Sequence, residues 1–81
     1  MGVLELEPGI DSKLNAVVDW WNEPKGHGFA KCEDGTPVFI HYRYFVLHAA
    51  GQRISLDVGQ GLRLKVVQDP KGPRGEAIEI L

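Results

Sequence analysis

Apolar and polar residues alternate in several short stretches of the chain, which is the pattern of strands with one buried and one exposed face. Turn-forming Gly, Pro, Asn and Asp residues separate these stretches, and no long helical period is visible. Five short strands joined in this way predict an all-β fold, a five-stranded antiparallel barrel whose closure removes exposed sheet edges. The strands are expected at Leu14–Trp21, Gly26–Cys32, Val38–His41, Leu62–Val67 and Ala77–Leu81.

The segments between and before these strands are less regular. Tyr42–Ala50 loses the alternation and is expected to contain a helical turn, whereas Gly51–Leu56 is ambiguous. Gln68–Gly75 is rich in Pro and Gly and predicts a loop. We divide the chain into an N-terminal extension, residues 1–13, and one domain, residues 14–81. Within the extension, Val3–Glu7 is either part of a frayed terminus or an extra strand on a sheet edge.

Two neighbouring strands are each expected to have one small or aliphatic face and one aromatic face, because strand side chains alternate. Gly26 and Gly28 fall on the small face, and glycine inside a strand needs a packing reason. The next strand directs Val38 and Ile40 to its apolar face. The other face carries Lys25, His27, Phe29 and Lys31 from one strand and Phe39 and His41 from the next.

The charge of the chain is unevenly distributed. Its 81 residues have a formal net charge of −2, but the first twelve residues contain Glu5, Glu7 and Asp11 and no base. The remainder is near neutral, which predicts modest affinity for nucleic acid, since phosphate neutralisation supplies most non-specific binding. One hypothesis is that the acidic extension lies across the aromatic face and competes with phosphate. A domain of this size also has a thin core, which makes an elaborate catalytic cleft difficult to build.

Cys32 is the single cysteine, so the chain can form no intramolecular disulfide or Cys-rich metal site. A lone thiol fits a reducing compartment. The sequence has no apolar run long enough to span a membrane and no signal-peptide pattern, so a cytoplasmic location is expected. Cys32 itself is expected to be a small buried hydrophobe rather than a nucleophile.

The aromatic face has the chemistry of a surface for single-stranded nucleic acid. An aromatic ring beside a base contributes about 1–3 kcal/mol with little sequence preference, and a duplex hides the faces of its bases. Phe29 and Phe39 would stack on bases, and Lys25, Lys31, Arg43 and Arg53 would line the rim and meet phosphates. Hydrogen bonds from Asn22 or His41 to base edges would add a mild preference.

The motifs on this face, in order and at their spacing, resemble those of the bacterial cold-shock domain over residues 14–81. Lys25-Gly26-His27-Gly28-Phe29-Ala30 resembles the first ribonucleoprotein-type motif of that family, and Val38-Phe39-Ile40-His41 the second. Further matches are Trp20-Trp21-Asn22, Gly51, Arg53, Leu56, Gly59-Gln60 and Lys71-Gly72-Pro73. The resemblance implies an oligonucleotide-binding (OB) barrel that binds single-stranded RNA or DNA, acting as an RNA chaperone or a regulator of transcription or translation.

The resemblance also implies roles for individual residues. It implies stacking by Trp20, Trp21, Phe29, Phe39, His41 and Tyr42, and backbone or base contacts by Asn22, Lys25 and Arg53. Strict alternation puts Trp20 and Trp21 on opposite faces, so both reach a ligand only if the strand is bulged. Trp21 is about equally expected to pack under the N-terminal extension instead.

Three features depart from the family pattern and predict weaker binding than is typical. Asp19 stands where the family usually has Lys, His27 stands where it has Phe, and the extension is longer and more acidic than usual. His27 has three interpretations, as a neutral stacking ring, a pH-dependent phosphate contact or an inert surface residue. In the second, protonation adds affinity below neutral pH.

Other functions have less support. A zinc site from His27, His41 and Cys32 is awkward because Cys32 falls on the opposite strand face from His27. Residues 26–28 form no phosphate loop, since no helix follows them. We expect no enzyme activity, cofactor, small-molecule substrate or membrane partner. The main alternative is a protein-interaction barrel that has kept the fold and has weakened or lost nucleic-acid binding, which Asp19 and the negative net charge favour.

Overall fold

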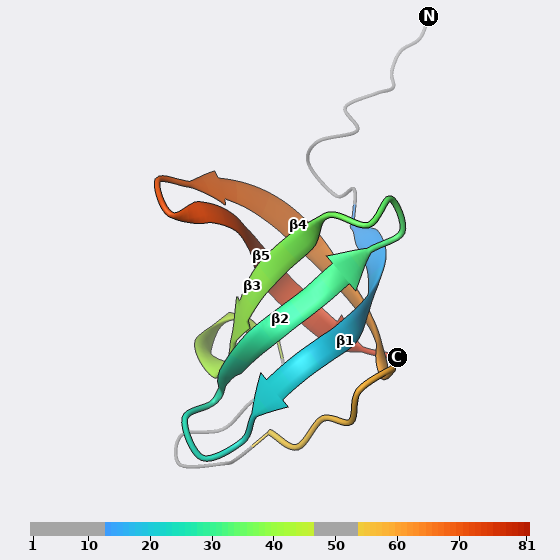
Figure 1. The fold of residues 1–81 in the computed structure, drawn as a ribbon, viewed down its shortest axis with the longest axis vertical. Coiled ribbons are helices and arrows are strands. Elements are labelled where there is room, and N and C mark those ends of the chain that lie inside the picture. The colour runs from blue at the N-terminus through green and yellow to red at the C-terminus, as the bar shows by residue number, and fades with distance from the viewer. Residues whose placement is uncertain (1–12, 47–53) are drawn as a thin grey trace, which may run out of the picture.

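The computed structural model describes residues 13–46 and 54–81, and in these ranges the sheet closes into a barrel. The strands lie in the order β1-β2-β3-β5-β4, and β4 returns to β1 (Figure 1). A short 3₁₀ helix follows β3. The elements are β1 (Leu14–Asn22), β2 (His27–Cys32), β3 (Pro37–His41), η2 (Tyr42–Tyr44), β4 (Gly61–Asp69) and β5 (Gly72–Ile80).

The predicted all-β barrel is therefore confirmed, with one difference in strand direction. Four neighbouring pairs are antiparallel, but β3 and β5 run parallel, with Phe39 opposite Arg74. After β3 the chain continues through η2 to β4, which pairs with β1. β5 then runs antiparallel to β4 and lies beside β3 in the same direction. The predicted Val3–Glu7 strand and the predicted contact residue Arg53 lie outside the described residues. Within the described ranges, no helix is long and apolar enough to cross a membrane.

The interior of the barrel is filled by the aliphatic positions of the alternating strands. Val38 and Ile40 of β3 and Leu62 and Leu64 of β4 are completely buried, as their alternation predicts. Ala30 and Cys32 of β2 are also buried. Phe29, between the buried residues Gly28 and Ala30, points outward. The described core consists of Ala16, Val18, Ala30, Cys32, Val38, Ile40, Phe45, Ile54, Leu62, Leu64 and Ile78.

A β-bulge at Asp19 changes the direction of the side chains in the second half of β1. Val18 is opposite Ala30, but Trp20 is opposite Phe29, so two residues of β1 face one residue of β2. Before the bulge Ala16 and Val18 point inward and are buried, and after it Trp20 points outward and is 47% exposed. An extra residue of this kind bends and twists the strand locally. The bulge is thus the local structure that brings Trp20 to the outer face.

The predicted loop at Gln68–Gly75 is wrong, because most of it is strand. β4 continues to Asp69 and β5 begins at Gly72, with Gln68 opposite Pro73 in an antiparallel hairpin. Gly72 has a φ of 126°, which glycine adopts without strain. The backbone N–H of Lys71 donates to Oδ1 of Asp69 across the turn. Pro73 is tolerated because it lies at the beginning of its strand.

Candidate nucleic-acid interface

Three aromatic side chains lie in register on adjacent strands at the outer face of the barrel. Trp20 of β1 pairs with Phe29 of β2, which pairs with Phe39 of β3. In the next row, Asn22 pairs with His27, and His27 with His41. We call the outward side chains of Trp20, His27, Phe29, Phe39 and His41 the aromatic platform.

The rings of the platform touch one another at their edges. The ring centroids of Phe29 and Phe39 are 5.8 Å apart, and those of His27 and Phe39 are 6.0 Å apart. Trp20 contacts His27 in an edge-on arrangement at 5.7 Å. Such edge contacts are a favoured arrangement of aromatic pairs and leave ring faces available. The described exposure agrees with this, since Trp20 is 47% and Phe29 43% exposed despite their size.

At its other end, the platform continues into the 3₁₀ helix. The centroids of His41 and Tyr42 are 4.6 Å apart, and Tyr42 is exposed. Nδ1 of His41 accepts the backbone N–H of Arg43 and thereby caps η2. Burial lowers the pKa of His41, and the charge of Arg43 and the neighbouring His27 lower it further. A neutral imidazole is also the form whose Nδ1 can accept this hydrogen bond.

Trp21 points to the opposite side of β1 from Trp20. Its indole N–H donates to the backbone carbonyl of Ile54 over 2.8 Å, and its ring meets Phe45 edge-on at 5.8 Å. It is partly buried against the core. The bulge that both tryptophans would need in order to reach a ligand is present, but Trp20 and Trp21 still point to opposite sides of β1. Trp21 therefore packs against the core of the barrel, and the N-terminal extension under which it is predicted to pack lies outside the described residues.

The remaining predicted contact residues surround the platform. Oδ1 of Asn22 accepts the backbone N–H of Lys25 and so stabilises the turn between β1 and β2. Gly26 ends this turn with a φ of 68°, and a Cβ there would lie 2.4 Å from the ring of Tyr42. The turn and Tyr42 are thus packed closely together. The exposed cations nearest in sequence to the platform residues are Lys25, Lys31 and Arg43.

Cys32 and His27 lie on opposite faces of β2, as alternation predicts. Cys32 is buried, and burial raises the pKa of its thiol, with the carboxylates of Asp34 and Glu33 adding to the effect. The thiol is therefore held in the protonated, poorly nucleophilic form. In the part of the chain that the structure describes, no three His, Cys, Asp or Glu side chains gather in a way that could hold a metal ion.

Comparison with known proteins agrees with this geometry. Residues 14–81 match the family model of the 'Cold-shock' DNA-binding domain. The chain belongs to this family. It is 34% identical over 62 residues to the cold shock-like protein CspLB of Listeria monocytogenes, covering 76% of this chain and 89% of the relative. It is 31% identical over 72 residues to the major cold shock protein CspA of Pseudomonas aeruginosa, covering 89% of this chain and all of the relative.

A solved structure shows the same fold at low sequence identity. The structure titled drosophila Unr CSD456 superposes with a TM-score of 0.67 at 15% identity, over 89% of this chain and 28% of that one. The cold-shock fold predicted from the sequence motifs is thus confirmed. Because members of the family bind nucleic acid, the outer aromatic face of this cold-shock domain is its candidate interface.

Sequence reasoning missed one part of this surface, a hollow of about 580 Å³ beside the platform. The β4–β5 hairpin forms one wall, and Phe29 and Phe39 belong to the other. The remaining lining residues are Pro37, Tyr44, Asp69, Lys71, Gly72, Pro73 and Arg74. The sequence pattern predicts a loop for the hairpin residues and therefore does not place them next to the platform. The available signal was the Lys71-Gly72-Pro73 match to the family.

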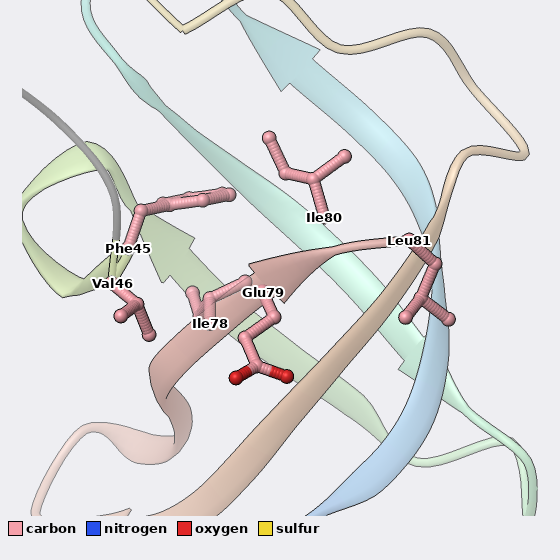
Figure 2. Close-up of a pocket in the computed structure, with 6 residues that line it drawn as sticks. All are labelled: Phe45, Val46, Ile78, Glu79, Ile80 and Leu81. Atoms are coloured by element: carbon pink, nitrogen blue, oxygen red, sulfur yellow. The ribbon is translucent and has the colours of Figure 1, made fainter.

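A second hollow of about 380 Å³ has different chemistry. Its described lining residues are Phe45, Val46, Ile78, Glu79, Ile80 and Leu81, and none of these is cationic. Phe45 and Ile80 project toward the same space, whereas the carboxylate of Glu79 points away (Figure 2). Apolar walls without a cation do not suit a phosphate backbone. We therefore do not include this hollow in the nucleic-acid interface.

Proposed function

We propose that this cold-shock domain binds single-stranded RNA or DNA by stacking bases on the aromatic platform. The observation that carries the proposal is the row of Trp20, Phe29 and Phe39 on three adjacent strands, with all three side chains at the outer face. Bases in a duplex are stacked on each other and cannot reach such a row. The platform therefore selects unpaired strands, and each stacked base contributes about 1–3 kcal/mol.

Stacking has a larger share of this affinity than charge. Cations at the rim, such as Lys25 and Lys31, attract phosphates, but Asp19 lies beside Trp20 and repels them. The chain as a whole carries a net charge of −2. We expect affinity to fall with salt, because each phosphate contact releases counterions, but less steeply than for a basic protein.

Binding of this kind favours open RNA by mass action. A protein that binds only unpaired strands shifts the folding equilibrium of weak hairpins toward the open form. The domain would thus act as an RNA chaperone in the cytoplasm, or regulate transcription or translation by covering a single strand. Such a function needs neither ATP nor a catalytic group.

Tryptophan fluorescence provides the test, because Trp20 lies in the platform. Titration with oligo-dT at low salt should quench the emission, and a duplex of the same length should have much less effect. Phe29→Ala should weaken binding without changing its salt dependence, and Lys25→Ala should make the dependence of log K on log[salt] shallower by about one. Absence of any quenching or binding by oligo-dT would contradict the proposal and favour a protein-interaction barrel.

A further inference from the structure

Arg74 occupies the position next to the platform in the same row of residues. It is opposite Phe39 in the parallel pairing of β3 and β5, so the row Trp20–Phe29–Phe39 continues onto a fourth strand. Arg74 also lines the hollow of about 580 Å³ that Phe29 and Phe39 border. Its side chain retains 24% of its exposure. If one base stacks on Phe39, the next base along this row would therefore lie beside Arg74.

The guanidinium of Arg74 is fixed by three neighbours. Its Nε donates to Oε2 of Glu76 over 3.1 Å, one terminal nitrogen donates to the same oxygen, and the other donates to Asp69. The central carbon of the guanidinium lies over the ring of Tyr44, 5.0 Å from the ring centroid. Hydrogen bonds and a ring contact together leave the group little freedom, so the guanidinium has a defined orientation at the wall of the hollow.

The local charge makes Arg74 a poor partner for phosphate. Two carboxylates, from Asp69 and Glu76, contact one guanidinium, so the cluster carries no excess positive charge. A guanidinium plane can nevertheless stack on a base, as an aromatic ring does. Immobilising the group in advance lowers the entropy lost when a base stacks on it.

We propose that Arg74, clamped by Asp69, Glu76 and Tyr44, is a stacking position for one further nucleobase at the end of the aromatic platform. The inference rests on the proposed function, because it extends the same single strand by one base. If Arg74 only held the β4–β5 hairpin together, it would contribute to folding stability but not to the affinity for nucleic acid.

The test compares two variants of Arg74 with a matched arginine. Arg74→Ala removes the plane, and Arg74→Lys keeps the charge but not the plane. Arg63→Ala is the control, since Arg63 is an exposed arginine of β4 that does not line the hollow. In the sheet it lies opposite Asn15 of β1 and Glu79 of β5. Binding of oligo-dT is measured over a range of salt concentrations at a temperature where urea titration shows every variant to be folded.

We expect Arg74→Ala and Arg74→Lys each to lose about fivefold or more in affinity, which is the effect of losing one stacked base. The salt dependence of Arg74→Lys, which keeps the charge beside Asp69 and Glu76, should remain that of wild type, and Arg63→Ala should bind as wild type does. In NMR spectra of the wild type, the Nε–H resonance of Arg74 should move upfield on addition of oligo-dT, because a base ring then lies over it.

Wild-type affinity in both Arg74 variants would overturn the inference while leaving the proposed function intact. A loss in Arg74→Ala that is restored in Arg74→Lys and accompanied by a shallower salt dependence would also overturn it, because the residue would then be a phosphate contact. An equal loss in Arg63→Ala would also overturn the inference, because the effect would then not be specific to the row of residues that contains Arg74. Failure of the wild type to bind oligo-dT would contradict the proposed function itself.

Discussion

The backbone of Trp20 occupies the space where a side chain of residue 28 would lie. A Cβ built on Gly28 would be 2.0 Å from the carbonyl oxygen of Trp20 and 2.8 Å from Cα of Trp21. These contacts are with backbone, which cannot move aside as the end of a side chain can. Gly28 is therefore the packing partner of the β1 bulge, and the bulge is what turns Trp20 outward.

This relationship predicts that Gly28→Ala damages both the fold and the interface. Overpacking of a buried site costs about 1–3 kcal/mol in the free energy of unfolding, and relief by straightening β1 would remove Trp20 from the platform. Urea titration should show the loss of stability, and oligo-dT titration of the folded variant should show weaker binding. Gly61→Ala is the control, because its nearest contact is the side chain of Leu81 at 3.5 Å. Equal stability of the two variants would contradict this account of the bulge.

Phe29→Ala should separate binding from folding. The side chain is 43% exposed and lies outside the core, so its removal should change the free energy of unfolding by less than about 1 kcal/mol. Loss of one stacking ring should weaken binding of oligo-dT by about fivefold or more. Ile80→Ala, at an exposed position of β5 in the hollow that lies outside the interface, should leave affinity unchanged. Unaltered binding by Phe29→Ala would argue against a stacking role for this ring.

The two tryptophans should behave in opposite ways. Trp21→Phe removes the hydrogen bond to the Ile54 carbonyl and should cost about 1–2 kcal/mol in stability, with little change in affinity. Trp20→Ala should leave stability nearly unchanged and weaken binding by about fivefold or more. Paired urea and oligonucleotide titrations check both. If Trp21→Phe were fully folded but bound oligo-dT much more weakly, Trp21 would be a stacking residue, which contradicts this account.

Stability should fall on acidification because of His41. The folded chain lowers the pKa of His41 below its ordinary value of 6.5, so the unfolded chain binds the proton more readily. The free energy of unfolding is therefore unaffected above that value and decreases as the pH falls through it. Asn at position 41 can accept the N–H of Arg43 without titrating, so His41→Asn should flatten this decrease. An identical pH profile in the variant would contradict the assignment to His41.

Alternation alone predicted most of the barrel. The buried faces of β2, β3 and β4 follow directly from it, because small or aliphatic residues at every second position of a strand face the core together. The outward direction of Phe29 and Phe39 follows from the same alternation. The turn-forming residues also mark the β1–β2 and β2–β3 turns, where Gly26 and Gly35 have φ values of 68° and 90° that other residues avoid.

What alternation could not predict depends on pairing between distant segments. The direction of Trp20 depends on one extra residue in β1 opposite β2, which changes the period without changing the composition. The β4–β5 hairpin looked like a loop because Pro73 and Gly72 break strands in isolation, whereas cross-strand pairing with Gln68 and Asp69 keeps them in the sheet. The contacts of Arg74 with Asp69 and Tyr44 could not be predicted for the same reason, because they depend on this pairing.

Chemical-shift mapping of the folded chain with oligo-dT and with a duplex of equal length tests the central claim most directly. Stacking on the platform predicts that the single strand shifts the resonances of Trp20, Phe29 and Phe39 strongly, and that Ile80 and Arg63 on other parts of the barrel surface are unaffected. The duplex should cause much weaker shifts. Equal effects of the two ligands, or shifts centred away from the platform, would contradict it.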